Sequence, residues 1–185
     1  ALARATGQLQ QSDHGLPRDV RAEAPSGAAA TQALLADSGM TPVRANEDLL
    51  RPLTYLPARP GIAGLDLRRW PDRRDDEIRQ VKDAAFADHW GSAPTTPERW
   101  HQIVHGHGSR LDLSFVAVDA DDRIVALAYN CRFEEEDEVV GRRDGWIEAL
   151  GTLRPWRGRG VASALIACSL HAFAAEGLTH AAINV

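Results

Sequence analysis

Residues 157–163, Arg-Gly-Arg-Gly-Val-Ala-Ser, combine the glycines and cations that an anion-binding loop requires. A strand-like apolar run precedes them, and a long segment with helical apolar spacing follows. Gly158 and Gly160 allow the backbone to turn sharply and approach a ligand. The unpaired N–H groups of the first helical turn, together with the helix dipole, favour an anion at the same point. The sequence therefore predicts a phosphate or pyrophosphate site, to which Arg157 and Arg159 add charged donors.

Two common phosphate-binding motifs do not fit this loop. A nucleotide-hydrolase loop needs Gly-Lys-Ser/Thr, and the single lysine of the chain, Lys82, lies far away. A dinucleotide fingerprint needs a third glycine where this chain has Ser163, and an acidic residue further on that is absent. An Arg-Gly turn on the surface and a nucleic-acid patch remain as alternatives. The net charge of −5 and the lack of a wider basic stripe argue against nucleic acid.

The segment Arg157–Ala162 resembles the R/Q-x-x-G-x-G/A pyrophosphate loop of the GCN5-related N-acetyltransferases (GNAT), which hold acetyl-coenzyme A. Residues 150–152, Leu-Gly-Thr, resemble the strand of that family that pairs with the pantetheine arm. Followed by Trp-Arg-Gly-Arg-Gly, they also resemble the tandem-repeat, mycothiol synthase-like actinobacterial branch. The resemblance implies an α/β fold with a mixed sheet, the acyl-CoA N-acyltransferase fold, with acetyl-CoA as substrate. The cofactor-binding residues that it implies are Leu150, Gly151, Thr152, Arg157, Gly158, Arg159, Gly160, Val161, Ala162 and Ser163.

The composition is that of a soluble globular protein with room for one sizeable core. The chain has 185 residues, of which 44% are hydrophobic and 25% charged. No apolar run reaches the length of a membrane span, and no signal-peptide pattern is visible. Cys131 and Cys168 form neither a disulfide framework nor a zinc motif. We therefore expect a cytoplasmic protein without membrane or nucleic-acid partners.

The proline-rich residues 58–63 predict a stiff linker between two parts of the chain. Residues 64–185 follow the element order of the GNAT fold through its fifth strand, and we interpret them as the N-terminal part of a GNAT domain. Residues 1–57 offer a strand, a helix and a second extended segment, which we interpret as the C-terminal part of a degenerate first GNAT-like repeat. The predicted strands are 19–24, 65–70, 111–119, 123–133, 146–153 and 180–185, and the main helices are 28–38, 75–89 and 161–176, with a further helix capped by Thr96.

The ends of the chain suggest a fragment of a longer protein. It begins without methionine and ends at Val185 within a predicted strand. The family continues with a helix and two more strands. We therefore expect the helix and strand of residues 28–53 to dock beside the last strand, because an uncovered edge invites association. Fragment complementation and dimerisation are further possibilities.

Glu148 is the candidate catalytic base. Acetyl transfer to an amine needs a neutral amine, an aimed attack and a proton for the leaving thiolate. Glu148 lies on the strand that leads into the loop, on the face predicted to hold Trp146 and Leu150. A glutamate on this strand resembles the base of several family members, and a solvent-facing strand carboxylate is the alternative. The family's usual general acid, a tyrosine on the helix after the fifth strand, has no counterpart here.

Three other features have chemical and structural interpretations. The acidic residues 134–138 could attract a cationic amine, or form a solvated loop. Trp90 could line an acceptor pocket or cap the core. The sequence His-Gly-His-Gly at residues 105–108 lacks partner ligands at suitable spacing, so we expect no metal site.

The predicted function is acetyl-CoA-dependent N-acetyl transfer, directly from the thioester to a primary amine of a small-molecule acceptor. The first alternative is a non-catalytic, degenerate or regulatory module that only binds coenzyme A. The second is an interaction domain whose Arg-Gly loop binds an acidic partner.

Overall fold

The computed structural model describes residues 20–185, and the chain divides into two compact units, Ala1–Ala45 and Asn46–Val185. In the first unit, helix α2 (Ala29–Asp37) has no buried residue. A turn at residues 26–27 precedes this helix, and Gly39, at a φ of +78°, follows it. The strand predicted at 19–24 is wrong over its described residues 20–24, which form no regular element. An alternating pattern forms a strand only where a neighbouring strand completes its hydrogen bonds.

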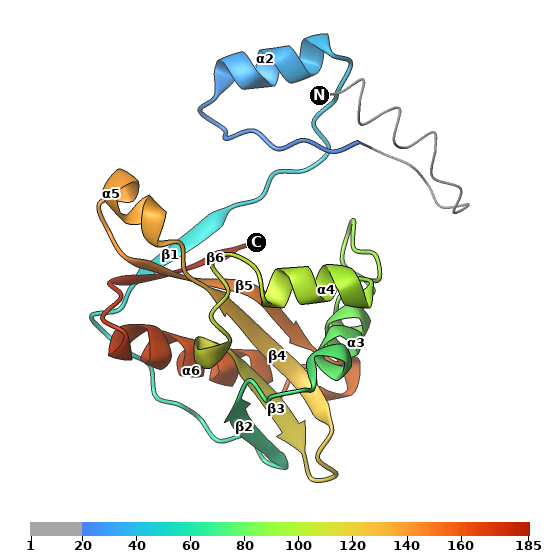
Figure 1. Cartoon of the computed structure of the whole chain (residues 1–185), viewed down its shortest axis with the longest axis vertical. Coiled ribbons are helices and arrows are strands. Elements are labelled where there is room, and N and C mark those ends of the chain that lie inside the picture. Colours follow the sequence, from blue (N-terminus) through green and yellow to red (C-terminus); the bar gives the residue numbers. More distant parts are fainter. Residues whose placement is uncertain (1–19) are drawn as a thin grey trace. The chain divides into compact units, whose positions relative to one another are not determined.

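Six strands of the second unit form one mixed sheet in the order β1-β6-β5-β4-β3-β2 (Figure 1). Strands β5 and β6 are parallel, and every other neighbouring pair is antiparallel. The sheet and its helices confirm the predicted α/β class with a mixed sheet. The strands are β1 (Asp48–Pro52), β2 (Leu65–Arg69), β3 (Phe115–Asp119), β4 (Ile124–Cys131), β5 (Asp144–Thr152) and β6 (His180–Asn184).

Helices cover both faces of the sheet because the central strands are apolar on both sides. Helices α3 (Asp75–Ala85) and α4 (Pro97–Val104) pack on one face, where Trp70, Trp100 and Tyr129 gather. Helix α6 (Val161–Ala175) packs on the other, with Phe173 fully buried. Shorter elements complete the unit: α5 (Asp137–Val140) and the 3₁₀ turns Leu111–Leu113, Glu134–Glu136 and Arg154–Trp156.

The N-terminal cap of α4 agrees with the sequence prediction. The Thr96 hydroxyl accepts a hydrogen bond from the Arg99 N–H at 3.2 Å, and Pro97 follows Thr96 as the first helical residue. This side chain therefore satisfies one of the donors that every helix start leaves unpaired.

Two irregularities shape β5. Tyr129 of β4 pairs with Ala149, whereas the next residue pairs with Ile147, so Glu148 has no partner on β4 and forms a β-bulge. On the other side, β6 pairs with β5 only at residues 144–146. Beyond Trp146 the two parallel strands therefore no longer pair, and within residues 20–185 no other strand pairs with the β6 side of residues 147–152.

The second unit begins at Asn46, before the linker that the sequence predicted at residues 58–63. Residues 46–57 belong to the same unit as the main sheet, since β1 pairs antiparallel with β6 and Leu53 is buried in the core under α6. Ile62 packs on the same core, and His171 of α6 lies 2.8 Å from the Pro57 carbonyl oxygen. A proline-rich segment can look like a linker in sequence and still pack, because its contacts are distant along the chain. The pairing of β1 with β6 agrees with the expected docking of this strand.

Among residues 20–185, none of the helices combines the length and apolar character that crossing a membrane requires.

Candidate functional site

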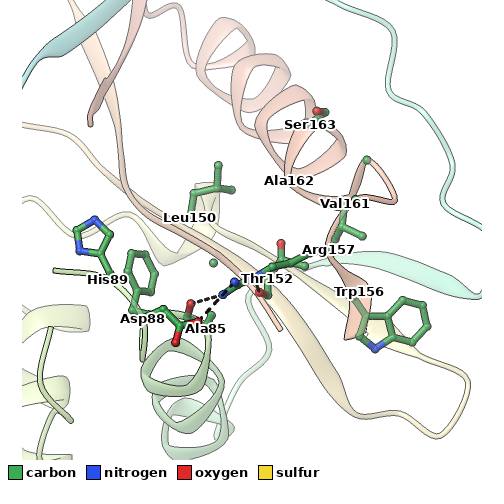
Figure 2. A pocket seen from close by; sticks show the side chains of 14 residues that line it. Ala85, Asp88, His89, Leu150, Thr152, Trp156, Arg157, Val161, Ala162 and Ser163 are labelled. Atoms are coloured by element: carbon green, nitrogen blue, oxygen red, sulfur yellow. Dashed lines mark hydrogen bonds and ion pairs between the residues drawn. The ribbon is translucent and has the colours of Figure 1, made fainter. Parts of the chain in front are cut away.

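A pocket of about 600 Å³ opens between the end of β5, the C-terminal end of α3 and the N-terminus of α6 (Figure 2). Its lining brings together most of the residues that the sequence assigned to the cofactor. The lining residues are Ala85, Phe86, Asp88, His89, Leu150, Gly151, Thr152, Trp156, Arg157, Gly158, Gly160, Val161, Ala162 and Ser163.

The loop before α6 presents a row of free backbone donors. Gly158 and Gly160 adopt left-handed φ values of +73° and +81°, and no side chain caps the helix that begins at Val161. The first hydrogen bond of the helix runs from the Ala164 N–H to the Gly160 carbonyl oxygen, so within the described part of the chain the N–H groups of residues 160–163 have no acceptor. We call these groups the N–H cradle. Since a helix N-terminus also carries a partial positive charge, the cradle fits a phosphate or pyrophosphate group.

The end of β5 offers polar and apolar surface next to the cradle. The Thr152 side chain lines the pocket, and its buried Oγ1 has no hydrogen-bond partner among the described residues. Leu150 and Gly151 line the same wall, and the β6 side of this stretch is unpaired. A group that continues from the cradle along β5 would therefore meet strand backbone that β6 leaves unpaired, apart from the Thr152 carbonyl, which accepts from Arg157.

The two loop arginines do not have equivalent surroundings. The Arg157 guanidinium donates to the Ala85 carbonyl oxygen at 2.7 Å and to the Thr152 carbonyl oxygen at 3.0 Å. The Arg159 guanidinium lies over the Trp156 ring, 4.9 Å from its centroid. The sequence predicted phosphate contacts for both side chains, but it did not predict the carbonyl bonds of Arg157.

Glu148 lies outside the lining of this pocket. The Glu148 side chain is exposed, as the solvent-facing alternative predicted, but neighbouring protein removes part of the water around its carboxyl group. This partial desolvation raises the pKa of Glu148 above its ordinary value, and the charge of Asp48 on β1 raises it further. The sequence placed Glu148, Trp146 and Leu150 on one face of β5. This prediction is wrong, because Trp146 and Leu150 lie on opposite faces of the sheet. Trp146 packs on the α3 and α4 side, whereas Leu150 packs on the α6 side, because the bulge interrupts the alternation.

Neither tyrosine of the chain lines the pocket. Tyr129 is buried and donates to the Ile103 carbonyl oxygen at 2.8 Å, while Tyr55 is 81% exposed. The described residues therefore place no tyrosine hydroxyl where it could protonate a leaving group in this pocket.

The acidic residues 134–138 are partly paired within the protein. Asp137 accepts hydrogen bonds from Arg132, and Glu135 lies 2.5 Å from the His107 ring nitrogen. These contacts favour a structural role for part of the run. Trp90 is 51% exposed and does not line the pocket, and within residues 20–185 no group of three or more potential ligands could hold a metal ion.

Sequence reasoning missed one wall of the pocket. Phe86, Asp88 and His89 follow α3, which ends at Ala85 although the sequence predicted a helix through residue 89. The sequence places the run Asp-His-Trp-Gly at residues 88–91 near the acceptor-binding loops of the family, but it assigns a pocket role to Trp90 and not to Asp88 or His89.

A model of the acetyltransferase (GNAT) family matches residues 75–185. The chain belongs to the GNAT family. Its six-stranded mixed sheet with helices on both faces is the GNAT fold, as the resemblance implied.

Solved structures share this GNAT fold. A GCN5-related N-acetyltransferase from Sphaerobacter thermophilus superposes with a TM-score of 0.68 at 24% identity, over 86% of this chain and 48% of that protein. An aminoglycoside acetyltransferase from an uncultured soil metagenomic sample, solved with sisomicin, gives 0.52 at 15% identity, over 65% of this chain and 76% of that protein. A putative acetyltransferase from Pyrococcus furiosus gives 0.50 at 16% identity, over 65% of this chain and 82% of that protein. This chain thus spans about half of the Sphaerobacter protein. No curated protein matches it.

Proposed function

We propose that this GNAT chain binds acetyl-CoA and belongs to an N-acetyltransferase that acetylates a primary amine of a small-molecule acceptor. The observation that carries the proposal is the N–H cradle, in which residues 160–163 line a pocket of about 600 Å³ and leave their backbone N–H groups without a partner at the start of α6. A diphosphate is the ligand that such a row of donors at a helix start fits best.

Each part of the site would have its own role. The cradle would bind the pyrophosphate, and residues 150–152 would pair with the pantetheine arm through the free side of β5. The bound thioester supplies the acetyl group. Glu148 would accept a proton from the acceptor ammonium, directly or through water, since a raised pKa brings a carboxylate closer to the affinity that a base needs near neutral pH.

A cationic acceptor suits the charges near Glu148. Asp48 is close enough to influence the Glu148 pKa, so two carboxylates lie on this part of the sheet. The fold neighbour solved with sisomicin is a protein of the same architecture with an amine-rich ligand. The cytoplasmic location, the mycothiol synthase-like branch and the degenerate first repeat stay predictions.

Two measurements test the proposal in sequence. Calorimetric titration with acetyl-CoA should show saturable binding. Thiol release should then be measured with amine acceptors of three kinds: an aminoglycoside, a polyamine and a peptide N-terminus. We expect turnover with at least one amine and a large loss of turnover in Glu148→Gln, with acetyl-CoA binding retained.

The outcomes separate the alternatives. Binding without turnover for any amine would favour the non-catalytic coenzyme A module. A folded chain that does not bind acetyl-CoA would contradict the proposal.

A further inference from the structure

Arg157 connects three separate parts of the pocket wall. Its backbone belongs to the loop before α6, its Nη2 donates to the carbonyl of Ala85 at the end of α3, and its Nε donates to the carbonyl of Thr152 at the end of β5. Its Nη1 also lies 3.8 Å from a carboxylate oxygen of Asp88. Figure 2 shows this guanidinium directed toward Ala85 and Asp88, at the α3 side of the pocket.

The acceptors that Arg157 binds are ones that the fold leaves unpaired. Ala85 is the last residue of α3, and the final carbonyl groups of a helix have no N–H partner within the helix. A cation at this end also interacts favourably with the helix dipole. The guanidinium is planar and fixes two donors in one geometry, which an ammonium group cannot do. These bonds therefore commit the Arg157 guanidinium to the protein backbone.

A second ion pair ties the same wall to the loop. Arg154 donates to both carboxylate oxygens of Asp88, with its Nε at 2.9 Å from Oδ2. Asp88 lies just beyond α3, and Arg154 lies in the 3₁₀ turn before Arg157. Both side chains of this pair are at least half exposed, so we expect it to contribute less than the carbonyl bonds of Arg157.

We propose that Arg157 is a positioning residue, which holds the end of α3 against the end of β5, and that the N–H cradle binds the pyrophosphate without this guanidinium. We call the contacts of Arg157 with the Ala85 and Thr152 carbonyls the Arg157 clasp. The inference rests on the proposed function for its ligand, but the clasp itself can be tested without one. It reverses the role that the loop motif suggested for this side chain.

The clasp acts on the part of the pocket beside β5. Residues 86–89 form the wall opposite the N-terminus of α6, and the proposed pantetheine path along residues 150–152 runs between them. Loss of the clasp releases this wall, whereas the cradle keeps its glycine-determined backbone. The clasp should therefore matter for coenzyme A and not for a ligand that ends at the pyrophosphate.

The test compares two ligands and two variants in the full chain. The ligands are coenzyme A and 3′-phosphoadenosine 5′-diphosphate, which lacks the pantetheine arm. The variants are Arg157→Ala and Arg157→Lys, with Arg159→Ala as the matched loop arginine. For both Arg157 variants we expect coenzyme A to bind about tenfold more weakly, the equivalent of one charge-assisted hydrogen bond. The nucleotide should bind within about twofold of wild type, because its cradle contacts are unchanged.

A direct contact between the Arg157 guanidinium and the ligand phosphate would give a different pattern of affinities. If Arg157→Ala weakens both ligands equally and Arg157→Lys restores them, the side chain binds phosphate as a point charge and the proposal is wrong. Arg159→Ala serves as the reference for loss of one loop charge, and its effect should be the same for both ligands and decrease with added salt.

Hydrogen exchange separates this proposal from the proposed function. Without ligand, Arg157→Lys should exchange faster than wild type at the backbone N–H groups of residues 86–89, while the core of α6 stays protected. Unchanged exchange at residues 86–89 would overturn the clasp even if acetyl-CoA binds. Conversely, faster exchange in a chain that does not bind acetyl-CoA would support the clasp and contradict only the proposed function.

Discussion

Substitution of Gly158 tests whether the backbone conformation of the cradle, and not the space around it, determines ligand binding. A Cβ atom at this position would have no heavy atom within 4 Å, so a side chain adds no clash. The φ of +73° is nevertheless a conformation that costs an L-residue about 1–2 kcal/mol. Valine should be near the upper end of that range because it is β-branched, whereas asparagine tolerates left-handed backbone.

The comparison of Gly158→Val with Gly158→Asn therefore isolates the backbone effect. If the valine variant keeps the cradle, it loses about 2 kcal/mol of stability, or roughly 4–8 °C in Tm for a chain of this size. If the loop relaxes instead, its N–H groups turn away and the same free energy appears as acetyl-CoA binding that is about 30-fold weaker. Gly158→Asn should stay within about threefold of wild type in affinity. Thermal unfolding and calorimetric titration on the same samples measure both quantities.

Equal affinities and equal Tm values for the valine and asparagine variants would refute the reasoning, since both fill the same open space. A large loss in the asparagine variant would also refute it, because a polar side chain that tolerates this φ should preserve the cradle.

Three further predictions follow from the same geometry. Gly151→Ala should lower Tm by several degrees and weaken acetyl-CoA binding, because its Cβ would lie 3.1 Å from two side-chain atoms of the α3 wall and overpacking costs about 1–3 kcal/mol. Glu148→Gln should raise Tm at pH 7, because the raised pKa of Glu148 disfavours its ionised form in the folded state. Asp48→Asn should shift the acidic limb of the rate profile to lower pH, because it removes the charge that helps to raise the Glu148 pKa. A chain of residues 54–185, which lacks β1 and the buried Leu53, should be less stable than a chain of residues 46–185 by about 2–5 kcal/mol, the cost of one buried leucine.

Each of these predictions has a control within the chain. Gly27→Ala has open space at its Cβ and should leave Tm unchanged, so an equal loss in both alanine variants would count against the packing argument. The stability gained in Glu148→Gln should disappear as the pH falls through the raised pKa, and a gain that persists in acid would point to another cause. Equal Tm values for the two shortened chains would mean that β1 does not stabilise the sheet.

The sequence predicted the elements whose signals are local. The helix at 161–175 follows from continuous apolar spacing, and the cap at Thr96 follows from residue types within four positions. The cradle was predictable for the same reason, because its glycines, its helix and the preceding strand are consecutive in the chain. These features depend on residue types that are close together in the sequence.

The missed features depend on partners that are distant in sequence. Arg157 binds the carbonyl of a residue 72 positions earlier, a contact that its own motif does not encode. The bulge at Glu148 exists only in the pairing of β5 with β4, so period-two reasoning placed Leu150 on the wrong face. Ile62, within the predicted linker at 58–63, packs on the core cluster to which α6 contributes. In each case the residue is evident in the sequence, but its contacts in the fold involve segments that are distant along the chain.

The bulge and the separation from β6 together explain why one strand can serve both halves of the proposed reaction. A bulge bends and twists its strand, and β5 loses its pairing with β6 immediately before Glu148. The unpaired β6 side of β5 then runs from residue 147 to residue 152, and the pocket lining along it begins at Leu150. Because a strand rises about 3.3 Å per residue, roughly 13 Å of β5 separates Glu148 from Thr152. An extended arm anchored at the cradle and bound along this side would carry its far end toward Glu148, so the strand itself sets the distance between the pyrophosphate site and the proposed base.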